Sequence, residues 1–259
     1  MTRTSEFSYI KVGAVAAALM AVSAFVFFAL FNALSTADPR TETAQFLSDA
    51  ATRQGLAATV AWTNTVLGIL TVPLYLGLYY AFRRSSQSYM LLALIAGIAW
   101  GLVLVIITPV MFTLLVQVAP GWASSSDLMT RNQLANSAVT LGWVINTTIG
   151  GTVFFLRAVS VLLVSRVMLQ LGGRLWVGLA WLGLIFALEH VVTGIQRVFV
   201  TGSGGAAGST MLGAIGGVML SIWLIGVGIG LWRRHETEPS TLAGESLPRT
   251  SLTTMERAG

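Results

Sequence analysis

The residues of this chain that could do chemistry inside a membrane are four polar side chains on one apolar stretch and an arginine on the stretch before it. The four are Glu189, His190, Thr193 and Arg197, and the arginine is Arg157. On a helix, Glu189, Thr193 and Arg197 lie in a line because they are four residues apart, with His190 about 100° around the axis from Glu189. A charged group at the centre of a membrane helix costs roughly 2.5–3.5 kcal/mol and usually faces the interior beside a partner. The pattern predicts a polar intramembrane core.

The expected ion pair within this core joins Arg157 to Glu189. The short connection Arg166–Arg174 predicts an antiparallel hairpin between the two stretches. Counted back from that turn, Arg157 is level with about Gly183, which places it roughly 9 Å from Glu189 along the axis. A long arginine side chain covers much of that gap. Arg197 is the alternative partner of Glu189.

Three interpretations of the polar core stay open at this point. It is a satisfied network that fixes the helix register, or a substrate, ion or proton site in which Glu189 and His190 titrate and Arg157 holds an anionic group. In the third, Arg157 and Arg197 only extend to opposite membrane interfaces. A Glu-His pair with no second carboxylate or activated nucleophile beside it is a poor enzyme site, since Thr193 has no sign of activation. We therefore assign no catalytic residue.

Several classes of chemistry are excluded by the residues that are missing. The chain has no cysteine, which removes disulfides, thiolate metal sites and a cysteine nucleophile. Its two histidines, His190 and His235, are too few for a membrane di-iron site, and His235 lies in a charged tail. Lys11 is the only lysine, and no hydrolase or phosphate-loop motif occurs. We expect no metal and no cofactor.

The composition indicates that most of this chain lies in hydrocarbon. Of 259 residues, 55% are hydrophobic and only 10% are charged, against roughly 25% charged in a soluble domain. A spanning helix needs about 20 largely apolar residues. Six stretches qualify, so the predicted fold is an all-α polytopic bundle within 1–235: 12–34, 56–82, 90–118, 138–164, 175–200 and 211–232.

Basic residues predict that both termini are cytoplasmic. Ten of them fall on the side of the N-terminus, and the opposite loops hold three, Arg40, Arg53 and Arg131. The ten are Arg3, Lys11, Arg83, Arg84, Arg166, Arg174, Arg233, Arg234, Arg249 and Arg257. The first apolar run is too long for a cleaved signal sequence and is interpreted as a retained helix. Residues 236–259 are polar without a core, and we expect a disordered cytoplasmic tail.

Small residues four apart predict close helix packing, since backbones must approach closely for helices to associate in lipid. The motif occurs at Gly97 and Gly101, at Gly213 and Gly217, and at Gly226 and Gly230. These glycines either pack within one bundle or, on the sixth stretch, form the seam of a homodimer. Pro73 and Pro109 predict kinks, and a polar patch around Asn64 precedes the first of them.

Two segments carry a resemblance to a known family. They read LTVPLYLGLYYAFRRSSQSYMLLALIAGIAWG and FFLRAVSVLLVSRVMLQLGGRLWVGLAWLGLI, within about residues 53–183. This half of the chain resembles small bacterial membrane proteins grouped only as a domain of unknown function (number 4386). The chain departs from that pattern because it lacks a proline-rich sequence at the glycine turn and carries Arg157 in the preceding helix. The resemblance implies a multi-helix bacterial inner-membrane protein and brings no known catalytic residues.

The sequence thus favours a non-enzymatic multi-pass protein of the inner (plasma) membrane. It is either an accessory or structural subunit or a small-molecule or ion-handling protein built around the polar core. The alternative is a membrane enzyme that acts on lipid, with Glu189 and His190 as acid–base groups. The expected partners are the lipid bilayer and either a second copy or other membrane subunits. The basic excess reflects membrane topology rather than nucleic-acid binding.

Overall fold

The structure, a computed structural model, describes residues 3–35, 37–199 and 215–234, and within these ranges the chain is helical with no strand. In chain order the elements are α1 (Arg3–Leu34), α2 (Thr43–Thr52), α3 (Gln54–Phe82), α4 (Gln87–Phe112), the π-helical segment η1 (Thr113–Val118), α5 (Ala119–Ser124), α6 (Leu128–Asn146), the π-helical segment η2 (Thr147–Val153), α7 (Phe154–Leu171) and α8 (Arg174–Phe199). A last helix covers Ile215–Arg234. The predicted tail and Gly213 lie outside the described residues.

Six helices in these ranges are long and apolar enough to cross a membrane, which confirms the predicted all-α polytopic bundle. Two of them are composite, because α4, η1 and α5 run on as Gln87–Ser124, and α6, η2 and α7 as Leu128–Leu171. At 1.5 Å per residue the 44 residues of the second extend about 66 Å, twice the thickness of a hydrocarbon core. The composite helices therefore project beyond the membrane.

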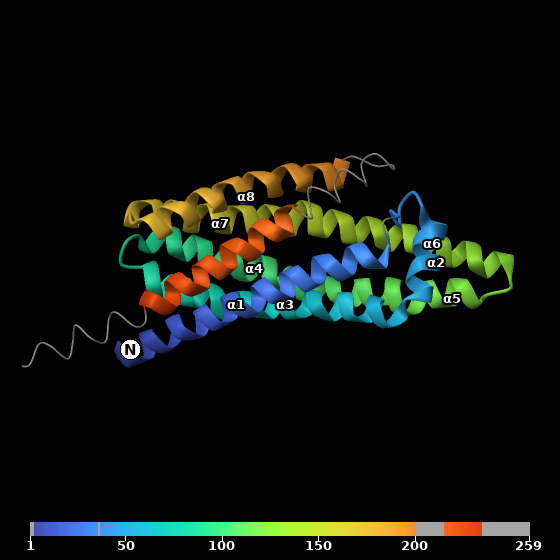
Figure 1. Cartoon of the computed structure of the whole chain (residues 1–259). Coiled ribbons are helices and arrows are strands. Elements are labelled where there is room, and N and C mark those ends of the chain that lie inside the picture. The colour runs from blue at the N-terminus through green and yellow to red at the C-terminus, as the bar shows by residue number, and fades with distance from the viewer. Residues whose placement is uncertain (1–2, 36, 200–214, 235–259) are drawn as a thin grey trace, which may run out of the picture.

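The start of α1 and the end of the last helix lie at the same end of the bundle. In Figure 1 the start of α1 and the Arg234 end of the last helix are together, as an even number of crossings requires. The opposite end, here named the loop end, holds α2, α5 and the start of α6. An apolar cluster there joins α2 to its neighbours through Phe46, Leu47 and Ala138.

The six spanning helices form a ring in chain order. α1 packs on α3, α3 on α4, α4 on α7 and α7 on α8. The last helix closes the ring, since Gly226 lies against Leu179 of α8 while Gly228 lies against Ala14 of α1. Large apolar side chains on the outside of the ring, such as Val22 and Ile106, are more than 60% exposed, as expected for side chains that contact lipid. The main core is therefore inside the ring.

Two local signals set the ends of the long helices. Asp127 caps α6, because its carboxylate accepts the backbone N–H of Met129 and of Thr130. At the other end, Gly172 and Gly173 adopt φ of 67° and 80°, a conformation that glycine reaches without strain. Because both glycines leave the helical conformation, α7 ends at Leu171, and the turn to α8 is only two residues long.

Candidate functional site

The α7–α8 hairpin brings Arg157 level with Glu189 and His190, six residues further along than expected from the sequence. The expected register placed the turn at the middle of the connection Arg166–Arg174, whereas Gly172 and Gly173 make the turn near the end of that connection. Arg157 is 14 residues from that end of α7, which is about 21 Å along the helix axis. The predicted offset between Arg157 and Glu189 was therefore wrong.

A chain of hydrogen bonds starts at Arg157 and ends at Thr193. Arg157 Nη1 lies 3.3 Å from His190 Nε2, and His190 Nδ1 lies 2.6 Å from Glu189 Oε2. Thr193 Oγ1 donates to Glu189 Oε1 at 2.6 Å. An arginine can only donate, so His190 Nε2 accepts, and His190 Nδ1 carries the ring proton that it donates to Glu189. The structure thus brings together four of the five predicted core residues.

The direct Arg157–Glu189 ion pair that we expected does not form. His190 stands between the two charges and contacts both. The ring of His190 is held by aromatic neighbours, with its centroid 4.0 Å from that of Phe186 and 4.7 Å from that of Phe154. The physical reason for the difference is that His190 follows Glu189 directly and is turned toward α7, so its ring reaches Arg157 first.

The last helix covers the carboxylate end of this relay. A Cβ added to Gly216 would fall against the Glu189 carboxylate, so glycine lets the backbone of the last helix approach without displacing that side chain. The Glu189 side chain is consequently only 10% exposed. His190 and Thr193 are buried as well.

Arg157 lies on a bed of aromatic rings that the sequence did not single out. Its guanidinium carbon is 4.3 Å from the ring centroid of Trp100 and 5.9 Å from that of Phe154. Its carbonyl accepts from Ser160 Oγ, which in turn lies 2.6 Å from the Tyr75 hydroxyl. Arg157 is 5% exposed, and its Nε has no hydrogen-bond partner. Contacts from α4, α7 and α8 therefore determine the position of this cation.

Arg197 does not join the relay. Its guanidinium carbon lies 5.3 Å from the centroid of Phe154, on a ring that Arg157 also approaches. Its side chain makes no ion pair with Glu189, and its buried Nε has no partner among the described residues. The backbone carbonyl of Arg197 accepts a hydrogen bond from Arg40 Nη1 at 2.9 Å. The alternative Arg197–Glu189 pair is absent.

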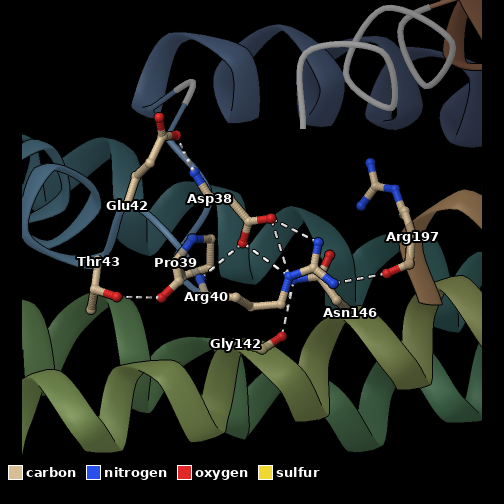
Figure 2. A network of polar contacts seen from close by, with 8 residues as sticks. All are labelled: Asp38, Pro39, Arg40, Glu42, Thr43, Gly142, Asn146 and Arg197. Atoms are coloured by element: carbon tan, nitrogen blue, oxygen red, sulfur yellow. Dashed lines mark hydrogen bonds and ion pairs between the residues drawn. The ribbon is translucent and has the colours of Figure 1, made fainter. Parts of the chain in front are cut away.

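Figure 2 shows a second polar cluster at the loop end, made by the segment after α1. Arg40 donates from Nε and Nη2 to the Asp38 carboxylate, the shortest contact being 2.7 Å, and both side chains are only 5% exposed. Asp38 Oδ1 also accepts the backbone N–H of Arg40. Pro39 packs against Gly142 of α6, where a Cβ would lie 3.1 Å from the proline ring. Sequence reasoning placed these residues in an external loop. The only signal for a buried pair was an acid and a base two residues apart around a proline.

Between the two polar clusters the ring encloses a partly open cavity of about 130 Å³. Arg157 and Trp100 lie along its deep part, and Asp38, Arg40 and Arg197 lie along the part near the loop end. Aromatic side chains of α1 and α7 form much of the remaining wall: Phe27, Phe28, Phe31 and Phe154. Neither Glu189 nor His190 lines the cavity. The relay therefore holds Arg157 from behind while the cavity lies before it.

The described packing glycines are used within one chain. Gly97 lies against the Tyr75 ring, and Gly101 against Thr71 of α3. On the last helix, Gly217 meets Phe28, Gly226 meets Leu179 and Gly230 meets Trp176. Intrachain packing therefore accounts for these five positions. Gly213, also predicted to pack, is outside the described residues.

The polar patch near the first predicted kink is a contact between helices. Asn64 donates from Nδ2 to the Leu104 carbonyl and to Thr108 Oγ1, both at 3.1 Å. Pro73 lies inside α3 without ending it, and Pro109 lies inside α4, one turn before η1 begins. The polar patch therefore joins α3 to α4.

Among the described residues no three His, Asp or Glu side chains gather as metal ligands.

No protein-family model, curated protein or solved structure matches this chain. The resemblance to the family of unknown function therefore stays a prediction.

Proposed function

We propose that this multi-pass membrane protein is a non-enzymatic, small-molecule-handling protein that binds its ligand in the intramembrane cavity. The observation that carries the proposal is that Arg157, 5% exposed and deep in the bundle, forms part of the wall of a partly open cavity. A relay through His190 and Glu189 holds this arginine in place. Ligand sites in helix bundles have this form, an apolar pocket with few fixed polar groups.

A purely structural polar core predicts a different interior. Protein interiors are close-packed, with few voids larger than a water molecule. A cavity of about 130 Å³ is close to the roughly 150 Å³ that accommodates benzene in an engineered protein. A network whose only role was to fix the helix register would close on itself, whereas Arg157 Nε has no partner. These features favour a binding role over a structural one.

The geometry gives no support to the alternative of a lipid-cleaving enzyme. An acid–base group must come within hydrogen-bond reach of the reacting atoms. Glu189 and His190 are absent from the cavity wall, and both hydrogen-bonding nitrogens of His190 are occupied by Arg157 and Glu189. We therefore interpret the Glu189–His190 pair as a support for Arg157.

Thiol labelling tests whether small molecules reach the cavity, since the natural chain has no cysteine to interfere. Ala24 and Ala17 are both 0% exposed on α1, but only Ala24 lines the cavity. We expect Ala24→Cys to react with neutral methyl methanethiosulfonate in the folded, detergent-purified protein. The matched Ala17→Cys protein should react only after denaturation. Equal protection of both thiols in the folded protein would contradict the proposal.

We further propose that the chain lies in the inner (plasma) membrane of a bacterium with both ends in the cytoplasm. The support is the distribution of basic residues in the segments outside the predicted spans, with Arg40, Arg53 and Arg131 on the side of the loop end against ten on the other side. A fluorescent protein that folds only in the cytoplasm, fused after residue 259, should fluoresce. The same reporter inserted after Ser125 should stay dark, and the reverse pattern would overturn this orientation.

A further inference from the structure

The charged residues that line the cavity are three arginines, Arg40, Arg157 and Arg197, and one carboxylate, Asp38. Asp38 is already used by Arg40, which binds it through two nitrogens. No carboxylate of the described residues forms an ion pair with Arg157 or Arg197, since Glu189 contacts His190 and Thr193 instead. Arginine stays charged in proteins. Glu189, which lies behind His190, attracts both arginines from a distance but pairs with neither. The described residues that line the cavity carry three positive charges against one negative charge, so the lining has an excess of positive charge.

The two arginines that have no ion-pair partner among the described residues are arranged around one ring. Both guanidinium carbons lie within 6 Å of the Phe154 centroid, Arg157 at 5.9 Å and Arg197 at 5.3 Å. In both side chains Nε is buried and has no hydrogen-bond partner. Guanidinium groups bind carboxylates and phosphates through paired N–H donors. The Nε–H donors without a partner and the excess of positive charge both favour the binding of an anionic group.

The rest of the wall calls for an apolar body. Apart from the charged residues, the lining is mostly aromatic and aliphatic, with Phe27 and Phe31 from α1 and Leu104 and Leu114 from the α4 span. The volume of about 130 Å³ limits the size of the guest, because a cavity of roughly 150 Å³ accommodates benzene. The space suits a body of about one aromatic ring and is too small for a complete lipid tail.

We propose that the cavity binds a small organic anion, a carboxylate or similar acid on an apolar body of about one ring, with its charged group at Arg157 and Arg197. This inference rests on the proposed function, which assigns the cavity to ligand binding, and adds the class of ligand. The same chemistry is present in a free organic acid and in an anionic lipid. The cavity volume selects the free acid.

The test uses three probes of the same shape and different charge on the Ala24→Cys protein. Benzoate, benzyl alcohol and benzylammonium are each added before the neutral thiol reagent. Benzoate should slow the labelling of Ala24→Cys about tenfold at saturation, because a bound guest excludes the reagent. The alcohol and the ammonium should protect little. Equal protection by the three probes would overturn the anion assignment, and no protection by benzoate would overturn the free one-ring acid. The proposed cavity function stands in both cases.

Failure of the proposed function itself gives a separate result, since Ala24→Cys would then not react in the absence of any probe. The source of the anion is tested by adding vesicles of phosphatidylglycerol. Protection by these vesicles and not by benzoate would overturn the free one-ring acid in favour of an anionic lipid.

Arg157→Met and Arg157→Lys, each made in the Ala24→Cys protein, test the residue. We expect Arg157→Met to raise the benzoate concentration for half protection about tenfold to a hundredfold, as the loss of a charged hydrogen-bonding partner predicts. Arg157→Lys keeps the charge and should recover part of the effect even if Arg157→Met folds poorly. An unchanged benzoate response in both variants would overturn the placement of the anion at Arg157.

Discussion

Replacement of His190 by phenylalanine would test whether the relay holds Arg157. Phenylalanine matches the ring and suits the neighbours Phe154 and Phe186, but it removes the 3.3 Å contact with Arg157 and the 2.6 Å contact with Glu189. Hydrogen bonds to charged groups contribute about 1.5–3 kcal/mol each. Membrane values are lower, on average about 0.6 and at most about 1.7 kcal/mol. From a value near 1 kcal/mol for the long contact and about 1.5 kcal/mol for the short one, we expect a loss of about 2.5 kcal/mol.

The assay is the free energy of unfolding in mixed micelles, measured by titration with dodecyl sulfate and followed by circular dichroism. His190→Asn is the control, because its amide can replace Nδ1 as a donor to Glu189 but cannot reach Arg157. It should lose about 1 kcal/mol, the value of the longer contact alone. The ranking expected is therefore wild type, then His190→Asn, then His190→Phe.

A double-mutant cycle sharpens the test. Arg157→Met and Glu189→Gln should couple in the wild-type background, and the coupling should fall to near zero with His190→Phe, because the histidine carries the interaction. A His190→Phe protein within about 0.5 kcal/mol of wild type, the ordinary scatter of such measurements, would refute the relay. So would a coupling between Arg157 and Glu189 that is unchanged by the loss of His190.

Three further predictions concern the scaffold. Gly101→Ala should lower the free energy of unfolding by about 1–3 kcal/mol in the same titration, since its Cβ has no space against α3. Gly178→Ala, in open space on α8, should be neutral or stabilising, and similar costs for both would contradict the helix packing. Hydrogen bonding from the side chain of Thr130 holds the pKa of Asp127 below its ordinary value. The cap on α6 is therefore present above that pKa and is lost as the pH falls through it. Hydrogen exchange of the first α6 amides should become faster as the cap is lost, and Asp127→Ala should remove this pH dependence. Tyr75→Phe should lower the stability by about 1 kcal/mol through the lost bond to Ser160, and a melting temperature equal to wild type would show that this bond contributes nothing.

The element boundaries show where hydropathy is informative and where it is not. The fourth predicted span begins at residue 138, but α6 begins at Leu128, capped by Asp127. Residues such as Asn132 and Gln133 are polar, so a hydropathy window excludes them although their backbone is helical. Hydropathy reports the part of a helix that lies in lipid, and backbone hydrogen bonding continues beyond it. The number of spans was therefore predictable and their ends were not.

The candidate site was predictable in part. Arg157, Glu189 and His190 stand out because charge is rare in apolar stretches, and helical spacing places Thr193 beside Glu189. Their pairing was not predictable, because a shift of the turn to Gly172 moved the register by six residues. Side chains that do not look unusual in sequence contribute most of the cavity, Trp100 and Phe154 among them.

The sequence by itself determined the membrane class, the six spans and the residue types that could carry charge inside the bundle. Those properties follow from composition and from local spacing, because hydrocarbon thickness and helix geometry act on each segment separately. Only the tertiary structure decided that His190 separates Arg157 from Glu189, and that Asp38 and Arg40 lie at a cavity rather than in an open loop. The first contact depends on the register of the α7–α8 hairpin, and the second lies in a segment that is held against α6 and α8. Their geometry depends on how six helices close into a ring, which no single segment encodes.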